Sequence, residues 1–155
     1  MITSQRCPKE WKEFGSSCYR FVVPTLQIRQ KSWEDARANC LGYGADLVSI
    51  RNSTEMDFIY NTTSQLGNLK FWIGFFRNKT TNFPKEGWVW SDGSSSNSTI
   101  PWSRGEPNNY KNNENCAEFF ARSKDWSDND CAKSFAYICK RRKGKLCVIY
   151  RCGVK

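Results

Sequence analysis

The segment from Ser32 to Ile50, SWEDARANCLGYGADLVSI, predicts a helix followed by a strand. Ser32 with Asp35 three residues later is a variant of the capping box that begins many helices. Apolar side chains then recur on one face at helical spacing, at Trp33, Ala36 and Cys40. Two glycines predict the end of the helix, and the run from Ala45 to Ile50 predicts a strand.

On either side of this segment the pattern continues in short elements. Residues 7–21 predict a small hairpin that turns at Gly15-Ser16-Ser17. Asn52, with Glu55 three residues later, predicts the start of a second helix, which fades near Gly67. Met56, Ile59 and Tyr60 are its expected apolar face.

Strands dominate the rest of the chain, together with one long irregular segment. The expected strands are 71–76, 88–90, 116–121 and 135–140. Residues 93–115 are rich in Ser, Asn, Gly and Pro, and so long an irregular segment inside a small domain is usually functional. This order of elements along the chain, a hairpin, two helices and then strands with a long loop, predicts an α+β fold whose helices are segregated from antiparallel strands.

Cysteine and histidine content narrows the class of protein. Eight cysteines in 155 residues indicate a disulfide framework formed in an oxidising compartment. The chain has no histidine and no CxxC pair, so a zinc protein is not expected. The absence of histidine also excludes a Ser-His-Asp triad or a Cys-His dyad, and we expect no enzyme.

The distribution of charge leaves two interpretations open. The net charge is +9, but the basic residues are scattered, except for residues 140–143 and Lys145. A solvated tail is the favoured interpretation of that run, and an anionic partner such as a sulfated glycan or a phospholipid head group is the alternative. A nucleic-acid partner is not expected.

Other features favour an extracellular protein, secreted or part of a membrane protein's ectodomain. No run of some 18 apolar residues occurs, so we expect no membrane span. Residues 1–6 lack an apolar signal core, so we expect the signal or anchor of an extracellular protein to lie outside this sequence. Candidate N-glycosylation acceptors have the Asn-x-Ser/Thr pattern and lie at Asn52, Asn61, Asn78 and Asn97.

Several short motifs occur in a fixed order along the chain. They are Cys7-Pro8 with Trp11, Cys18-Tyr19, Trp33 with Ala36 and Cys40, Ala45 to Ile50, Phe71-Trp72-Ile73-Gly74, Glu106-Pro107-Asn108, Glu114-Asn115-Cys116, Trp126-Ser127-Asp128 and Tyr137-Ile138-Cys139. Together they resemble the long form of the C-type lectin-like domain, from about Cys7 to Lys140. The resemblance is closest to the mannose-receptor group and the mannose-binding cell-surface lectins. It implies two helices packed on small antiparallel sheets, with a long ligand-binding loop.

The resemblance implies a set of disulfides and a domain boundary. The implied pairs are Cys7–Cys18, Cys40–Cys139 and Cys116–Cys131. Cys147 and Cys152 lie outside the family pattern, and we favour a pair between them over a bridge to another chain or to a following module. Residues 1–6 are then an N-terminal extension, 7–140 the domain, and 141–155 a basic tail with two extra cysteines.

The long segment also holds oxygen ligands suited to a calcium ion. Carboxylates and amides on irregular backbone are what Ca²⁺ prefers, although such residues also populate ordinary solvated loops. The resemblance implies that the calcium ligands are Glu106, Asn108, Glu114 and Asp128, and that these residues with Ser127 bind sugar. The order Glu106-Pro107-Asn108 implies a preference for equatorial 3- and 4-hydroxyls, as in mannose, glucose, N-acetylglucosamine or fucose.

The sequence departs from the family pattern in two ways, one at this calcium site and one at an accessory calcium site. Ser127 stands where the family has an asparagine, so one carbonyl ligand and one amide donor are missing. Arg77, Asn109 and Asn115 stand at positions of an accessory calcium site, which we therefore do not expect. Most tryptophans of this region are expected in the core rather than in a sugar-stacking surface.

The leading interpretation is a calcium-dependent lectin of mannose-type preference, acting in extracellular recognition, uptake or innate defence. The alternative is a domain of the same fold that binds a protein or an anionic ligand without calcium. One such domain binds a monosaccharide weakly, so useful strength would come from several copies, and an oligomer is possible.

Overall fold

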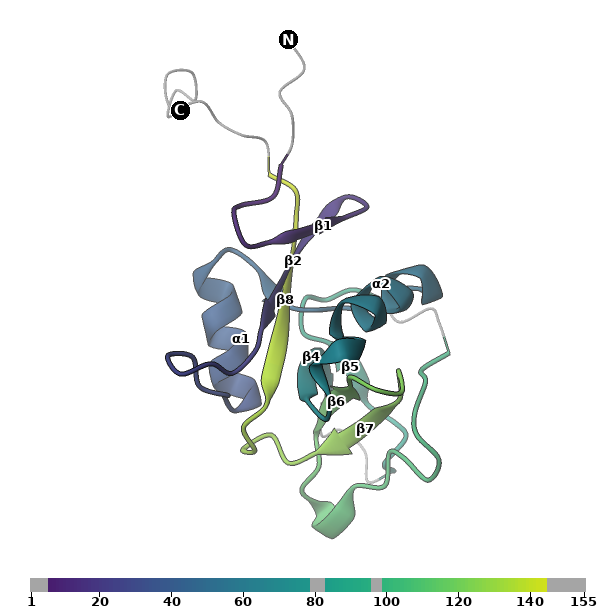
Figure 1. Cartoon of the computed structure of the whole chain (residues 1–155). Coiled ribbons are helices and arrows are strands. Elements are labelled where there is room, and N and C mark those ends of the chain that lie inside the picture. The colour runs from purple at the N-terminus through teal and green to yellow at the C-terminus, as the bar shows by residue number, and fades with distance from the viewer. Residues whose placement is uncertain (1–5, 79–82, 96–98, 145–155) are drawn as a thin grey trace, which may run out of the picture.

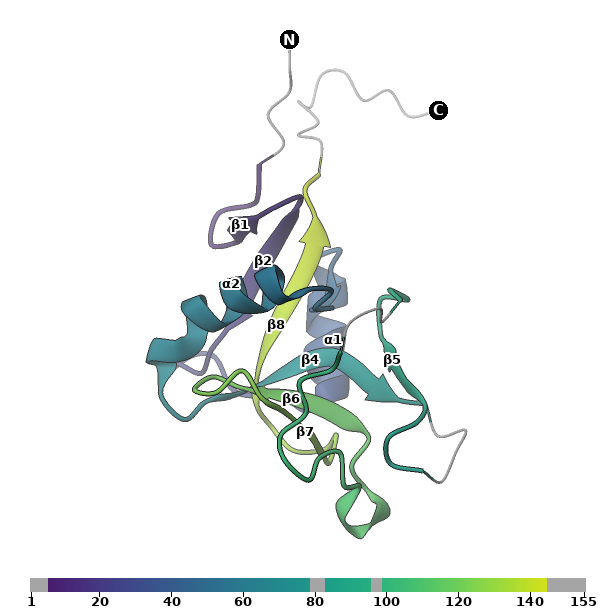
Figure 2. The ribbon, with the colours of Figure 1, turned by 90° about the vertical axis from the view of Figure 1, so that its right-hand side faces the viewer.

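The computed structural model describes residues 6–78, 83–95 and 99–144. Two α-helices, α1 (Trp33–Gly42) and α2 (Ser53–Thr63), lie on opposite sides of strand β8 (Ala136–Arg142) (Figures 1 and 2). The remaining strands are β1 (Lys12–Phe14), β2 (Ser17–Val22), β3 (Asp46–Leu47), β4 (Lys70–Arg77), β5 (Trp88–Trp90), β6 (Cys116–Phe120) and β7 (Trp126–Asn129). Two short 3₁₀ helices span Ser64–Leu66 and Tyr110–Asn112.

Both helices begin where their capping residues predict. Ser32 Oγ accepts from the Asp35 N–H at 3.2 Å and donates to the Asp35 carboxylate at 2.8 Å. Asn52 Oδ1 accepts from the Glu55 N–H at 2.8 Å. The α+β fold with two helices is therefore confirmed, and each helix starts at a side chain that satisfies one of its free N–H groups.

The strands form one sheet in the order β1-β2-β8-β4-β6-β7, with β3 paired to β8 and β5 paired to β4. The expectation of purely antiparallel pairing is wrong at one place, because β4 and β8 run parallel, with Phe71 opposite Ala136. The two strands are far apart in the sequence, so no local pattern indicated how they would pair.

Two of the strand predictions need correction. Strand β3 covers only two of the six residues predicted at 45–50, because Val48 bridges two strands: its N–H donates to Ile138 O of β8 and its carbonyl accepts from Gly74 N of β4. Strand β7 was not predicted, since Ser, Asp and Asn are uncommon in strands. It lies at the edge of the sheet, where it pairs only with β6 and, by one bridge at Trp126, with Trp102.

Gly74 allows a close approach between β4 and its neighbours. A Cβ added there would lie 2.7 Å from Leu47 O and 2.7 Å from Ser91 Oγ. A glycine is therefore required at this crossing.

Three disulfides tie this frame together, and they are the pairs that the resemblance implies: Cys7–Cys18, Cys40–Cys139 and Cys116–Cys131. The second joins α1 to β8 with a sequence separation of 99 residues. Cys147 and Cys152 lie outside the described residues.

The basic run at the end of the domain is part of the sheet. The solvated tail predicted for residues 140–143 is wrong at Lys140, Arg141 and Arg142, which belong to β8. Lys140 Nζ lies 2.5 Å from Glu55 Oε1, and both side chains are largely buried. The domain boundary predicted after Lys140 thus falls inside β8, whose last residue is Arg142.

Candidate functional site

The long segment of residues 93–115 is anchored to the sheet by backbone hydrogen bonds. Trp126 N donates to Pro101 O at 2.9 Å, and Ser103 N donates to Trp126 O at 2.8 Å. At its far end Arg77 N donates to Asn115 O at 2.8 Å, next to the disulfide of Cys116. Strand β7 therefore holds residues 101–103, and strand β4 holds the far end of the segment at Asn115.

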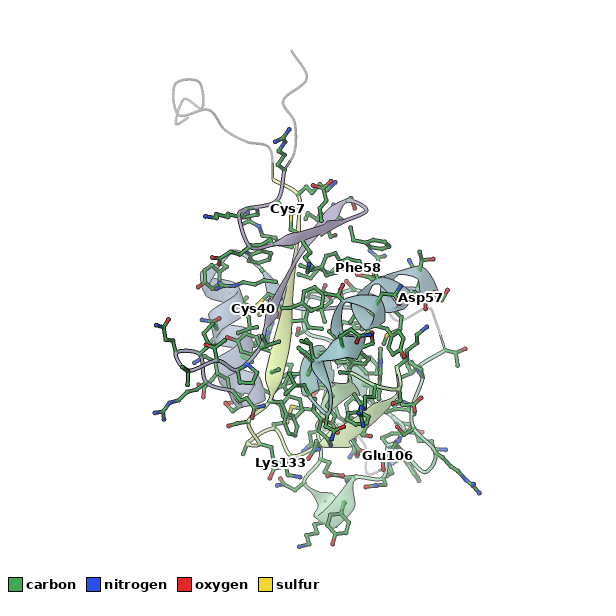
Figure 3. The ribbon with its side chains drawn as sticks, viewed as in Figure 1. Cys7, Cys40, Asp57, Phe58, Glu106 and Lys133 are labelled. Carbon is green, nitrogen blue, oxygen red and sulfur yellow. A yellow bond between two sulfur atoms is a disulfide. The ribbon has the colours of Figure 1, made fainter. Side chains whose placement is uncertain are left out.

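Three carboxylates converge where this segment passes β7. Glu106 and Glu114 come from the segment and Asp128 from β7, and one oxygen atom of each lies within 4.8 Å of the others. We call these three residues the carboxylate cluster. Glu106 lies at the end of the molecule remote from Cys7 (Figure 3). Asp128 is buried, whereas the two glutamates are half-buried and open to solvent.

Asp128 holds the segment in place through two backbone amides. Its Oδ1 accepts from Asn108 N at 3.1 Å and its Oδ2 accepts from Asn109 N at 2.7 Å. The peptide bond between Glu106 and Pro107 is cis. The two hydrogen bonds of Asp128 thus fix the turn that carries Glu106 and Asn108.

The other polar groups of the turn are linked to the cluster. Asn108 Nδ2 donates to Glu106 Oε1 at 2.7 Å. Glu114 Oε2 accepts from Tyr110 N at 3.0 Å, and Glu114 N donates to Asn109 Oδ1 at 3.1 Å. The structure therefore brings all four predicted ligand residues together.

The electrostatics of the cluster are unfavourable without a cation. Burial, followed by the hydrogen bond and the negative charge of Asp128, raises the pKa of Glu106 to about 7. Burial also raises the pKa of Glu114, and the charge of Asp128 adds to this effect although the Tyr110 N–H opposes it. In the described part of the chain, none of the three carboxylates forms an ion pair with a lysine or arginine.

This donor set fits a hard divalent cation. Three carboxylates and an adjacent amide oxygen are the ligand types that calcium prefers, and irregular backbone can place them around one point. Softer metals would call for histidine or thiolate ligands, which the cluster lacks. Among the residues that the structure describes, this is the one group of acidic, histidine or cysteine side chains that could hold a metal ion.

Ser127 contributes less than its position in the sequence suggests. It lies in β7 between two buried residues and opposite Glu118 on β6. Within the described ranges its hydroxyl makes no side-chain hydrogen bond. Ser127 lies beside Asp128 in the strand, but among the described residues its side chain adds no hydrogen bond to the cluster.

Two residues of the site were missed by sequence reasoning. Asn109 has a left-handed backbone (φ 49°) and its side chain accepts from Glu114 N, so it braces the turn. Asp130 Oδ2 accepts from Asn113 Nδ2 at 2.9 Å and ties the end of the loop to the segment after β7. The run of asparagines at 108–109 and 112–113 is the signal that could have indicated such bracing, since asparagine tolerates positive φ.

The aromatic side chains beneath the site form its floor. Trp90 and Trp126 are buried, and Trp88 and Trp102 pack against the same core. Ring centroids of Trp90 and Trp126 lie 5.7 Å apart, edge to face. These tryptophans therefore support the segment from below, as expected.

Several sequence predictions concern residues elsewhere. Asn52 caps α2, Asn61 and Asn78 are exposed, and Asn97 lies outside the described residues. In the described ranges, no helix has the length and apolar character needed to cross a membrane.

The chain is similar to known proteins over most of its length. The model of the lectin C-type domain family matches residues 29–141. CD209 antigen-like protein A of Mus musculus is 38% identical over 138 residues, which cover 87% of this chain and 52% of that protein. A C-type lectin of Thrasops jacksonii, one of the lectoxins, is 36% identical over 146 residues, covering 88% of this chain and 84% of that protein. The chain thus spans about half the length of the first relative.

Solved structures share the fold at lower identity. The carbohydrate-recognition domain of mouse scavenger receptor C-type lectin superposes with a TM-score of 0.77 and 27% identity, covering 90% of this chain and 100% of that one. A calcium-independent type II antifreeze protein superposes with a TM-score of 0.74 and 27% identity, covering 88% of this chain and 95% of that one.

Proposed function

The chain belongs to the C-type lectin domain family, and from this premise we propose that it binds carbohydrate through a calcium ion. The ligands of the ion would be Glu106, Asn108, Glu114 and Asp128. The preferred sugars would present equatorial 3- and 4-hydroxyls, as mannose, N-acetylglucosamine and fucose-type arrangements do. The setting would be extracellular recognition or innate defence.

The convergence of three carboxylates is the observation that carries this proposal. Their oxygens lie within 4.8 Å of one another, and no described basic side chain pairs with them. Like charges held this close raise each other's pKa and destabilise the segment that holds them. A divalent cation would remove this repulsion, so the arrangement makes physical sense as an ion site.

The side chains around the cluster would then orient the sugar. The ion would supply coordination positions for two adjacent sugar hydroxyls. The carboxylates of Glu106 and Glu114 would accept hydrogen bonds from those hydroxyls, and the Asn108 amide would donate one. Asp128 would keep the turn in register through the amides of Asn108 and Asn109.

The order of acceptor and donor supports the mannose-type preference. Glu106 can only accept when ionised, and Asn108 Nδ2 already points toward Glu106 Oε1. Glu106 before the proline would accept a hydrogen bond from one sugar hydroxyl, and Asn108 after it would donate one to the neighbouring hydroxyl. This order would determine how a pair of vicinal hydroxyls is oriented in the site. An amide donor at position 106 and a carboxylate acceptor at position 108 would reverse this orientation.

Affinity chromatography on immobilised mannose tests the proposal. We expect retention in the presence of calcium, release by a chelator, and passage through immobilised galactose. Glu106→Gln is the matched variant, because it keeps the shape of the side chain and removes one charge. Retention that survives the chelator, or equal retention of Glu106→Gln, would overturn the proposal.

Ser127→Asn measures how far the missing ligand weakens the site. The asparagine would restore one carbonyl and one amide donor, and a hydrogen bond to a charged or metal-bound group is worth about 1.5–3 kcal/mol. We therefore expect roughly tenfold or greater gains in calcium and mannose affinity by calorimetry. If the wild-type chain takes up no calcium at millimolar concentration but Ser127→Asn does, then Ser127 has inactivated the site.

Binding without calcium is the second candidate, and Ser127 favours it. The similar antifreeze protein is called calcium-independent, so this fold does not require the ion. On this alternative the carboxylate cluster would be a residual feature and the ligand a protein or an anion. Passage through immobilised mannose with and without calcium would favour it.

A further inference from the structure

A polar cavity lies at the end of β8, beside the start of α2. Its volume is about 820 Å³, and its wall includes none of the carboxylate cluster. Of its fifteen lining residues, twelve are polar or charged, two are aromatic and one is glycine. It is large enough to accept a sugar unit with a substituent, and its polar wall is unsuited to an apolar ligand.

The charges deep in this cavity neutralise one another. Glu55 accepts from Tyr19 OH at 2.5 Å and from Arg51 N at 2.9 Å, and it pairs with Lys140. Lys140 Nζ also donates to Ser49 O at 2.8 Å. These groups are satisfied within the protein, so they shape the cavity and leave little free charge.

One further carboxylate, Asp92, lies in the wall with its own donors. It accepts from Ser49 Oγ at 2.5 Å and from Ser94 N at 2.9 Å. Although burial opposes ionisation, these hydrogen bonds lower the pKa of Asp92 below its ordinary value. Asp92 is therefore a negative charge that an anion in the cavity would have to avoid.

Two of the three guanidinium groups that line the cavity, those of Arg51 and Arg142, have no partner among the described residues. Arg51 lies just before α2 and Arg142 at the end of β8, and both are exposed. Side chains alternate along a strand, so Arg142 shares the face of Lys140, whereas Arg141 turns to the other face and donates to Tyr43 O. The two free guanidiniums thus belong to the same cavity.

The charged lining residues are five basic side chains and two carboxylates. Lys140 pairs with Glu55, Lys143 pairs with Glu13, and Arg141 donates to Tyr43 O on the other face. The charges that remain in the cavity are those of Arg51, Arg142 and Asp92, a net charge of +1. Arginine binds planar and tetrahedral oxyanions through paired N–H groups, and the serine and asparagine groups of the wall supply neutral donors. The cavity therefore combines a positive charge with the donors that a polar, negatively charged ligand requires.

We propose that this cavity is a second, calcium-independent binding site for a sulfated sugar, with Arg51 and Arg142 holding the sulfate ester. Asn52, Ser17 and Ser94 would contact the sugar hydroxyls. A phosphate ester shares this chemistry. A lipid head group is less suitable, because the lining offers only Phe14 and Tyr19 as apolar rings, and Tyr19 is buried.

Calorimetric titration with a heparin-derived tetrasaccharide tests the proposal. A chelator removes calcium, so that the proposed calcium site does not contribute to the measured binding. All proteins carry Thr54→Val, which removes the glycan acceptor at Asn52 beside the cavity. We expect saturable 1:1 binding that Arg51→Gln with Arg142→Gln weakens about tenfold or more. Asp92→Asn should strengthen binding, because it removes a repulsive charge.

The matched control is Arg29→Gln with Arg122→Gln, which removes the same charge from exposed positions outside the cavity. We expect this control to change affinity by less than about twofold. An equal loss in both double variants would show that only net charge matters and would overturn the proposal, as would an absence of saturable binding.

Further arms distinguish the sources of the anion. An unsulfated tetrasaccharide should not bind, and inorganic sulfate and phosphate should compete weakly. The binding of the protein to vesicles that contain phosphatidylserine should be the same for the cavity variants as for the parent protein. Vesicle binding that depends on Arg51 and Arg142, together with unchanged oligosaccharide binding, would identify a membrane site instead. Because calcium is absent throughout, these outcomes do not depend on the lectin site.

Discussion

Glu55 on α2 and the carboxylate cluster show two ways in which this chain holds a buried acid. Glu55 is satisfied by a lysine, a tyrosine and a backbone amide of the same chain. The cluster brings three acids together and supplies amides but no basic side chain. The first arrangement is complete on folding, whereas the second would be completed by the cation of the proposed function. The comparison indicates which charges stabilise the frame and which serve a ligand.

Removing the internal partner should have the largest effect. Lys140→Met leaves Glu55 buried and unpaired, and breaking such a pair costs about 3–5 kcal/mol. Urea unfolding should show this loss equally with calcium and with a chelator. Lys124→Met is the matched control, because it breaks the exposed pair with Asp57 and should cost less than about 1 kcal/mol.

A second substitution tests whether the stability lost in Lys140→Met comes from the unpaired charge of Glu55. Lys140→Met with Glu55→Gln removes both charges and keeps an acceptor for the Tyr19 hydroxyl, and we expect it to recover most of the stability lost in Lys140→Met alone. If the double variant is no more stable than the single one, then the pair matters for packing rather than for charge.

Removing a member of the cluster should instead affect the ligand. Asp128→Asn loses a charge and also one of the two oxygens that accept from the backbone of the turn, so calcium affinity should fall by at least about 1.5–3 kcal/mol, or roughly ten- to hundredfold. Calorimetry measures this directly. Asp130→Asn is the control, because Asp130 lies outside the cluster, and an equal loss there would contradict the assignment.

Three of the five described non-glycine residues with positive φ lie in the loop. Lys111 has a left-handed backbone (φ 54°), a region that glycine enters without steric cost. Lys111→Gly should therefore stabilise the protein by about 1 kcal/mol in thermal or urea unfolding. Lys111→Ala removes the same charge but keeps the steric cost, and it should give no such gain.

The smallest effect concerns pH in the absence of calcium. The pKa of Glu106 is raised to about 7, so the folded protein binds this proton more tightly than the unfolded chain. The resulting stability is present below the ordinary pKa of a glutamate and is lost as pH rises through 7. Because Glu106 is half-exposed, we expect a change below about 1 kcal/mol. Melting temperatures from pH 5 to 8 should show a decline that is smaller in Glu106→Gln.

The helices could be predicted because their signals are local. Ser32 and Asn52 cap the two helices through residues three positions away, and such contacts are visible in the sequence. The parallel pairing of β4 with β8 depends on residues far apart, and β7 carries residues that seldom form strands. These features were therefore missed or misassigned.

The site was predictable in a different sense. Composition alone could not distinguish Glu106 and Glu114 from ordinary acids of a solvated loop, and their expected role came from the family resemblance. The structure adds what neither could supply, namely that Asp128 fixes the turn through two backbone amides. It also shows that Lys140 to Arg142 belong to the sheet, which charge patterning could not indicate.

The disulfide pattern also determines how the domain would respond to mechanical force. A pull applied before Cys7 and after Cys139 would pass through Cys7–Cys18, along the chain to Cys40, and across to Cys139. Residues 41–138, which include the whole carboxylate cluster, lie outside this covalent path. Tension could peel β2 from β8 pair by pair without stretching the chain that forms the site. The domain could therefore keep hold of a tethered ligand while its two ends are being drawn apart.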